Sequence, residues 1–399
     1  MSLIAHLDAD CFYVSAERVR HPGLKGKPVG VIGNQGACVI AKSYEMRKTG
    51  VKTGEAIWEA LKKCPDGIYL KRDFRWYEAL SKRMLGMVRE RHPMTEYYSI
   101  DEFFFQIEKP ERARDLQLLI LRDAGLPVTV GVARSRTLAK LFSDTAKPFG
   151  VRVVTDVATE RELLAKLSVQ EISGIADRSG KKLAERGINT CLDFAAADRR
   201  LIRSLLTKTG EDLWWELNGH KVQPIRPDRP QHQFISRGGS IGGASGDENK
   251  IRGWLARNTE RLVEELDYHE VRPGRLTLAL SVKEGESVGE DVRLESHTRR
   301  FDLLMAASAR MLDRVWRPGL IVSHMHLIAG DLRRDGFVQR SLFDPPDEPE
   351  SSLAVAKKEI NDKIGRFAVR SAATLHIPEM YRDRSHEFDV CDIRGKICF

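Results

Sequence analysis

The sequence lacks the long apolar segments and targeting signals of membrane or secreted proteins. No apolar run approaches the ~18 residues that cross a bilayer, and the first residues show no basic, apolar and small-residue regions of a signal peptide. Beyond two proline-rich linkers, we find no internal repeat and no low-complexity tract. We therefore expect a cytoplasmic protein with no membrane partner.

Cysteine is scarce and scattered. The spacing of the six cysteines contains no C-x-x-C pair, which argues against a structural zinc site and against a disulfide framework. Buried free thiols are the simpler interpretation. The cysteines are Cys11, Cys38, Cys64, Cys191, Cys391 and Cys398.

Length, composition and charge indicate a multidomain protein with a polyanionic partner. A chain of 399 residues is too long for one ordinary domain, and a hydrophobic content of 42% is sufficient for packed cores. The net charge is +8, and most of the basic excess lies within residues 1–150. A basic domain suits a ligand such as a nucleic acid.

Two acidic groups lie at apolar segments far apart in the chain. Asp8 ends the predicted strand 4–8, and Asp101 and Glu102 lie within the predicted strand 97–107. If these strands were neighbours, three carboxylates would meet, and their repulsion would require bound cations. Oxygen ligands favour Mg²⁺, and two such ions commonly promote displacement at phosphorus. The sequence therefore predicts a two-metal phosphoryl-transfer site.

This interpretation has alternatives. Asp10 lies on the same strand face as Asp8, but it can equally cap the following turn or lie in solvent. Adjacent Asp101 and Glu102 can reach one site only if the backbone turns between them. The D-x-D pattern also occurs in haloacid-dehalogenase-type phosphatases, so an unrelated phosphohydrolase stays open.

Periodicity predicts an α+β domain, a helical region and a second, smaller α+β domain. Residues 223–231, with three prolines, predict an extended tether. The segment 169–187 predicts a helix-turn-helix. Further strands are expected at 28–32, 37–41 and 127–133, and helices at 43–49, 56–63, 75–91, 111–123, 135–145, 250–266, 303–315 and 353–367.

Four motifs carry a family resemblance. The segments DADCFYVSAE, GACVIAKSYEMRKTGVKTG, YYSIDEFFF and LAKLFSDTAKP resemble, in order and spacing, those of Y-family translesion DNA polymerases, especially the UmuC-like branch. The resemblance covers roughly residues 1–345. It implies a multidomain right-hand polymerase with a palm, small fingers, a helical thumb and a tethered α+β little finger. The implied domains are palm and fingers (1–165), thumb (166–222), tether (223–231), little finger (232–338), and clamp-binding peptide with C-terminal extension (339–399).

The resemblance implies template-directed DNA synthesis past lesions, with low fidelity and no proofreading. The cofactor would be two Mg²⁺ ions, with Mn²⁺ as a substitute. The partners would be primer–template DNA, a dNTP, a sliding clamp, and UmuD-like or recombinase accessory proteins at the bacterial nucleoid. A non-catalytic adaptor of the same fold is the alternative within this family.

The resemblance also assigns the catalytic residues. Asp8 and Asp101 would bridge two metal ions, Glu102 would complete the catalytic metal site, and the Ala9 carbonyl would bind the second ion. Tyr13 would be the steric gate that excludes ribonucleotides, and its neighbour Phe12 would also bind the nucleotide. An ordinary core role for Tyr13 is the alternative.

Tyr44, Arg47 and Lys147 match the family's triphosphate ligands. Tyr44 and Arg47 are three residues apart on one predicted helix and can face one ligand. Arg47 and Lys147 could otherwise be solvated surface charges. Lys42 and Lys48 are expected on a solvated helix face.

Further residues are assigned to DNA and to the clamp. Gly174 and Ala176 belong to a helix-hairpin-helix that would contact a DNA phosphate, where a left-handed backbone at Ala176 would be strained. The assigned little-finger contacts are Arg237 and Ser240. The clamp-binding residues are Gln339, Leu342 and Phe343.

Overall fold

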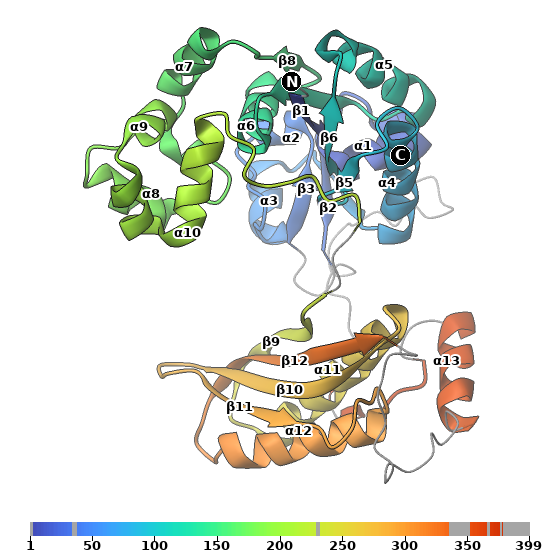
Figure 1. Ribbon diagram of the computed structural model, residues 1–399. Coiled ribbons are helices and arrows are strands. Elements are labelled where there is room, and N and C mark those ends of the chain that lie inside the picture. The colour runs from blue at the N-terminus through green and yellow to red at the C-terminus, as the bar shows by residue number, and fades with distance from the viewer. Residues whose placement is uncertain are drawn as a thin grey trace. The chain divides into compact units, whose positions relative to one another are not determined.

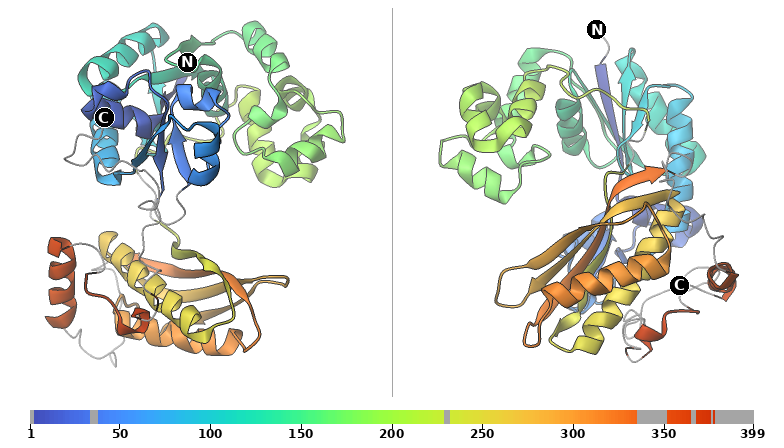
Figure 2. Two further views of the ribbon diagram at one scale, coloured as in Figure 1. Left: turned by 180° about the vertical axis from the view of Figure 1, so that it is seen from behind. Right: turned by 60° about the horizontal axis from the view of Figure 1, so that its bottom comes forward.

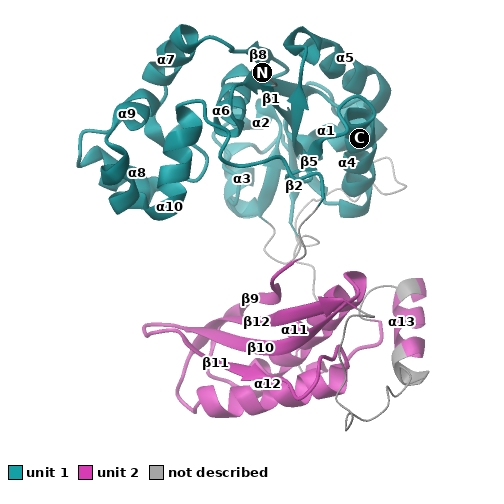
Figure 3. Cartoon of the chain, in the orientation of Figure 1, with its two compact units in different colours: residues 1–229, 383–399 teal, residues 230–382 magenta. Residues whose placement is uncertain are grey.

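A computed structural model describes residues 3–33, 38–228, 232–334, 352–364, 368–375 and 377. The chain divides into two compact units, residues 1–229 with 383–399 and residues 230–382 (Figure 3). The α+β class predicted from the sequence is confirmed in both. Within the described residues, no helix is sufficiently long and apolar to span a membrane.

Unit 1 is built on a five-stranded sheet in the order β5-β6-β1-β7-β8 (Figure 1). Its central strand β1 is antiparallel to β6 and β7 and is buried along nearly its whole length, which explains its continuous apolar sequence. The strands are β1 Leu3–Ala9, β5 Thr95–Tyr97, β6 Glu102–Ile107, β7 Val128–Ala133 and β8 Val151–Val153.

Helices cover both faces of this sheet. On one face pack α1, α4 and α5, with Leu7, Phe103 and Val130 pointing toward them. On the other face lies α6, with Ile4 and Phe104 in its core. The helices are α1 Phe12–Arg20, α4 Phe74–Arg89, α5 Ala113–Ala124 and α6 Arg136–Ala146.

A small three-stranded sheet lies in the order β3-β2-β4. Met46 is buried at the centre of its core, and β2 runs antiparallel to β3 and parallel to β4. The elements are β2 Val29–Ile32, β3 Val39–Lys42, β4 Ile68–Lys71, α2 Tyr44–Lys48 and α3 Ile57–Lys63. The described cysteines are free thiols; Cys64 and Cys191 are buried, as expected, whereas Cys11 and Cys38 are partly exposed.

The described residues of unit 1 that follow β8 are mainly helical, as predicted. They form α7 Val157–Lys166, α8 Asp177–Ala184, α9 Cys191–Ala196 and α10 Arg199–Leu217. Short 3-10 segments occur at η1 Pro22–Leu24, η2 Pro110–Arg112 and η3 Val169–Glu171.

The described part of the proline-rich segment is attached to unit 1. The Arg226 backbone N–H donates to Glu96 over 2.9 Å, and Arg89 donates to the Pro227 carbonyl over 2.8 Å. The side chain of Ile225 packs into the helical core.

Unit 2 is an antiparallel sheet with helices on one face. The strand order is β11-β10-β12-β9, and α11 and α12 lie on one face of this sheet (Figure 2). Leu278 and Leu327 belong to the core between the sheet and these helices. Along β10, residues that point to the opposite face are partly exposed, which explains the alternating sequence of this strand. The elements are β9 Ile235–Ser245, β10 Val271–Val282, β11 Val288–Arg293, β12 Val322–Arg334, α11 Glu248–Tyr268 and α12 Phe301–Val315.

A C-terminal extension packs against the outer side of α11. It contains α13 Ser352–Ile364 and the 3-10 segment η4 Ala372–Thr374. Ile377 is buried in the core of unit 2. The buried Glu260 carboxylate of α11 accepts from Lys357 at 2.5 Å and from the Ser371 backbone at 2.8 Å. The described residues of the extension therefore pack as part of unit 2.

Several local predictions were wrong. The single strand expected over 97–107 is two antiparallel strands, β5 and β6, separated by a turn. The helix expected before the 173–180 turn is only the three-residue η3. Helix α1 and strands β4 and β8 were not predicted.

The docking of the extension depends on the absence of a side chain at Gly253. A Cβ there would lie 2.5 Å from Ile377 Cδ1 and 3.2 Å from the Ala373 carbonyl. We predict that Gly253→Leu increases tryptic cleavage within 352–377 several-fold, although leucine favours helix by nearly 1 kcal/mol over glycine. Gly86→Leu, in an exposed helical position with open space around it, is the control and should leave cleavage unchanged. Equal cleavage in both variants would contradict the packing argument.

Candidate active site

A cavity of about 280 Å³ lies where β1 ends. It is lined by eight residues predicted for metal or nucleotide: Asp8, Ala9, Phe12, Tyr13, Tyr44, Arg47, Asp101 and Lys147. Cys11, Ile40, Ala41, Lys42, Thr53 and Ile100 complete the lining. The fold thus gathers segments that are far apart in sequence.

The strand register brings the acidic residues together. Asp8 of β1 lies directly opposite Glu102 of β6. A turn precedes β6: the Tyr98 and Ser99 N–H groups both lie 3.1 Å from the Glu102 carbonyl, and the Ala9 N–H donates to the Asp101 carbonyl over 3.0 Å. The backbone therefore turns at Asp101, as a shared site for both acids requires. We call Asp8, Asp101 and Glu102 the carboxylate cluster.

The electrostatics of the carboxylate cluster favour a bound cation. Burial raises the pKa of Asp8 to about 7, with a contribution from Glu102, although Lys147 acts in the opposite direction. Burial and Glu102 also raise the pKa of Asp101. Two lysines compensate part of the charge: Lys147 lies 2.7 Å from Asp8, and Lys140 is ion-paired with Glu102.

Basic side chains also line the cavity. Ser43 caps α2 by accepting from the Met46 N–H, and the Arg47 guanidinium stacks on Tyr44, 5.0 Å from the ring centroid. Lys42 was expected on a solvated helix face, but it lies in β3, lines the cavity and donates to Thr53 over 2.8 Å. Its position directly after the predicted strand 37–41 was the signal that could have identified it.

Asp10 is neither solvated nor a cap. Its side chain is 3% exposed, and α1 begins after Cys11 with no side-chain cap. The carboxylate accepts from Thr129 at 3.0 Å, from the Phe149 N–H at 2.8 Å and from Tyr44 at 3.3 Å. Asp10 therefore ties together β7, the segment after α6, and α2 around the cavity.

Tyr13 is held in place by a second aromatic ring. The rings of Tyr13 and Tyr77 stack with centroids 4.7 Å apart. The Tyr77 hydroxyl donates to Glu17 over 2.7 Å, and Arg20 pairs with the same carboxylate at 2.9 Å. Because Tyr77 is buried and anchored, Tyr13 has a fixed support at the wall of the cavity.

The predicted DNA contacts lie elsewhere in the chain. Gly174 has φ +101°, whereas Ala176 has φ −87°, so the strain anticipated at Ala176 does not occur. Arg237 points to the helical side of its sheet, where it pairs with Glu265, and Ser240 is exposed. Gln339, Leu342 and Phe343 lie outside the described residues.

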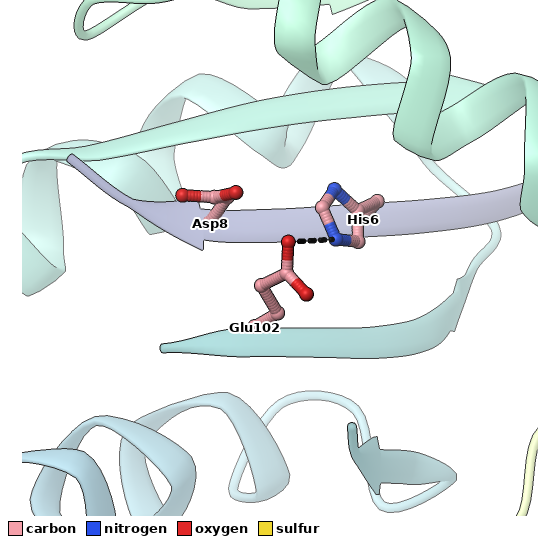
Figure 4. A group of neighbouring side chains, drawn as sticks. All are labelled: His6, Asp8 and Glu102. Carbon is pink, nitrogen blue, oxygen red and sulfur yellow. Dashed lines mark ion pairs between the residues drawn. The ribbon is translucent and has the colours of Figure 1, made fainter. Parts of the chain in front are cut away.

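His6 adjoins the carboxylate cluster and was not predicted. It precedes Asp8 by two residues on the same strand face, which was the available signal. Its Nε2 lies 3.7 Å from Glu102 Oε1, as Figure 4 shows, and its Nδ1 lies 2.6 Å from Ser143 Oγ. Complete burial lowers the pKa of His6 well below its usual value, and Lys140, Lys147 and Arg136 add to this effect.

Relatives with similar sequences include proteins named DNA polymerase IV and UmuC. DNA polymerase IV of Bacillus velezensis is 29% identical over 396 residues, covering 94% of this chain and 93% of that protein. Protein UmuC of Salmonella typhimurium is also 29% identical, over 388 residues, covering 91% of this chain and 92% of that protein.

Solved structures show a similar fold. A Y-family DNA polymerase chimera of Dbh and Dpo4 superposes with a TM-score of 0.72 at 23% identity, covering 84% of this chain and all of that one. The insertion ternary complex of Dbh DNA polymerase has a TM-score of 0.55, also at 23% identity and with the same coverage.

Two family models match separate parts of the chain. The impB/mucB/samB family model matches residues 7–144, and the model of that family's C-terminal domain matches residues 232–342. With relatives aligned over almost the entire length, these matches confirm the resemblance seen in the motifs: the chain belongs to the impB/mucB/samB family, the Y-family DNA polymerases.

Proposed function

We propose that this protein is a template-directed DNA polymerase that performs translesion synthesis with low fidelity and without proofreading. One observation carries the proposal: a single cavity is lined both by the acidic residues Asp8 and Asp101 and by the basic residues Lys42, Arg47 and Lys147. Acids to hold metal ions and cations to hold a triphosphate are what nucleotidyl transfer requires. The relatives named DNA polymerase IV and UmuC support the same activity.

The carboxylate cluster fits a divalent cation. Its carboxylates are hard oxygen donors, and the raised pKa of Asp8 and Asp101 indicates that their negative charge is under-compensated. We propose that Asp8, Asp101, Glu102 and the Ala9 carbonyl hold two Mg²⁺ ions, for which Mn²⁺ can substitute. When bound, the ions would lower the pKa of the primer 3′-hydroxyl and stabilise the leaving pyrophosphate.

The chain's own residues orient the nucleotide. Arg47, stacked on Tyr44, offers a planar fork for two phosphate oxygens. Lys147 now pairs with Asp8 and Asp144. Burial acts to lower the pKa of Lys147, but the attraction of the Asp8 and Asp144 carboxylates is the stronger effect and raises this pKa above its usual value. Lys147 is therefore cationic and would turn to the triphosphate once cations neutralise Asp8.

The remaining partners follow from the family. We assign residues 1–165 to the palm and fingers, 166–222 to the thumb and 232–338 to the little finger. Primer–template DNA would meet the thumb at Gly174 and Ala176 and the little finger near Arg237 and Ser240. A contact through Arg237 requires its pair with Glu265 to open. We place the enzyme at the nucleoid in the bacterial cytoplasm.

The segment 339–399 would supply the clamp contact. Gln339, Leu342 and Phe343 match a short peptide in which glutamine meets a pocket rim and two apolar side chains fill the pocket. UmuD-like or recombinase accessory proteins are further proposed partners.

Primer extension tests the proposed function. With Mg²⁺ and dNTPs, wild-type protein should extend a DNA primer, and Asp101→Ala with Glu102→Ala should reduce the rate by at least about a thousandfold, since the metal ligands are lost. Retention of primer–template binding is the control. If wild type binds DNA but neither protein extends it, the adaptor alternative is favoured, whereas phosphate release from monoesters would indicate the phosphohydrolase.

Tyr13 tests the sugar selection. We predict that Tyr13→Ala raises ribonucleotide incorporation relative to deoxyribonucleotide by at least about tenfold, because removing the ring opens space for a 2′-hydroxyl. Tyr13→Phe keeps the ring against Tyr77 and should retain discrimination. Unchanged discrimination in Tyr13→Ala would show that another residue forms the gate.

In the metal-free protein, the buried charge of the Asp8 carboxylate should lower the free energy of unfolding. Because Asp8 has a folded pKa of about 7, above its unfolded value, its contribution to stability is present at low pH and is lost as pH rises through 7. Asp8→Asn should therefore stabilise the protein at pH 8 with a chelator, by on the order of 1 kcal/mol, and not at pH 4.

Denaturant unfolding at both pH values measures this effect. Asp144→Asn, which removes the other carboxylate partner of Lys147, is the control and should retain the wild-type pH dependence. At pH 8, saturating Mg²⁺ should raise the free energy of unfolding of the wild-type protein more than that of the Asp8→Asn variant. Destabilisation of Asp8→Asn at pH 8 would contradict the argument.

A further inference from the structure

The hydrogen bonds around His6 determine which of its nitrogens carries the proton. Ser143 Oγ lies 2.7 Å from the Lys140 carbonyl oxygen. Because a carbonyl oxygen only accepts, the Ser143 hydroxyl proton is the donor in this hydrogen bond. The same oxygen lies 2.6 Å from His6 Nδ1. Since the single serine proton is used on the carbonyl, His6 Nδ1–H must be the donor to Ser143. Neutral His6 therefore presents a lone pair at Nε2.

This lone pair is buried and has no hydrogen-bond partner. His6 is 0% exposed, and Nε2 is among the buried side-chain atoms that make no hydrogen bond. It points at Glu102 Oε1, 3.7 Å away (Figure 4). A lone pair facing a carboxylate oxygen is repulsive unless a proton or a cation lies between them. Ligand atoms of His6, Asp8 and Glu102 lie within 4.8 Å of one another.

We propose that His6 Nε2 is a nitrogen ligand for a divalent ion held with Asp8 and Glu102, and that it makes this site prefer first-row transition metals, such as Mn²⁺, over Mg²⁺. The inference rests on the proposed metal site and adds a ligand to it. Imidazole is a poor ligand for Mg²⁺ and a good one for transition metals. Asp8 lines the cavity, whereas His6 and Glu102 adjoin Asp8 outside its lining.

The surroundings of His6 match those of a metal-binding histidine. Such histidines usually donate their second N–H to an oxygen, which fixes the tautomer and the ring orientation. Here the chain from His6 to Ser143 to the Lys140 carbonyl does this. Lys140 pairs with the Glu102 oxygen that faces Nε2, so it supplies the positive charge when no metal ion is bound. A purely packed core histidine would not need an unpaired nitrogen directed at an acid.

Mn²⁺ is the probe for this site. The full-length protein, with its histidines labelled with ¹⁵N, is mixed with Mn²⁺, and pulsed electron paramagnetic resonance measures coupling of the bound ion to ¹⁵N. We expect coupling in wild type and none in His6→Leu. The Mn²⁺ affinity should fall at least about tenfold in His6→Leu, whereas the Mg²⁺ affinity, measured by competition, should change less than about threefold.

Matched variants separate a ligand from a structural role. Ser143→Ala keeps Nε2 but removes the oxygen that orients the ring, so it should retain the ¹⁵N coupling with a weaker Mn²⁺ affinity. If His6→Leu fails to fold, His6→Phe, which keeps a ring beside Phe104, replaces it.

Absence of bound Mn²⁺ in wild type, absence of ¹⁵N coupling, or equal loss of Mg²⁺ and Mn²⁺ affinity in His6→Leu would overturn the proposal. Primer extension by wild type with Mg²⁺ would still support the polymerase in any of these cases, so the two hypotheses fail separately.

Discussion

The repulsion between carboxylates on adjacent strands is the constraint on which this site depends. Asp8 and Glu102 are opposite each other in the β1–β6 register, and Asp101 lies at the turn beside them. In a buried position, such a pair costs free energy unless positive charge is close. The fold supplies this charge from α6 and the segment after it, through Lys140 and Lys147.

The close approach of α6 to the sheet makes this compensation possible. Gly131 of β7 is the register partner of His6, and a Cβ at Gly131 would lie 2.2 Å from the Ala139 carbonyl and 2.5 Å from the Ser143 nitrogen. Only glycine lets the helix lie directly on the strand. That contact places Lys140 and Ser143 above β1, so one backbone position supports both the counter-charge and the orientation of His6.

The sequence predicted the parts of this arrangement that are encoded locally. An acid at the end of an apolar run identified Asp8, and family motifs identified Arg47 and Lys147. The turn before β6 and the left-handed residue Cys11, which starts α1 without a capping side chain, have no strong local signal. The roles of His6 and Asp10 depend on partners more than 100 residues away, Ser143 and Thr129, and such pairs exist only after the sheet and α6 have packed.

The same cations can serve two roles in the proposed reaction cycle. In the metal-free protein, Lys147 and Lys140 are internal counter-ions of Asp8 and Glu102. If a divalent ion were held by these carboxylates, Lys147 and Lys140 would no longer be needed as their counter-ions and would be available to another anion. Lys147 already lines the cavity with Lys42 and Arg47, so a triphosphate is the anion within reach. Metal binding and nucleotide binding would thereby be coupled through electrostatics, because a cation at the carboxylates would free Lys147 to neutralise the charge of the triphosphate.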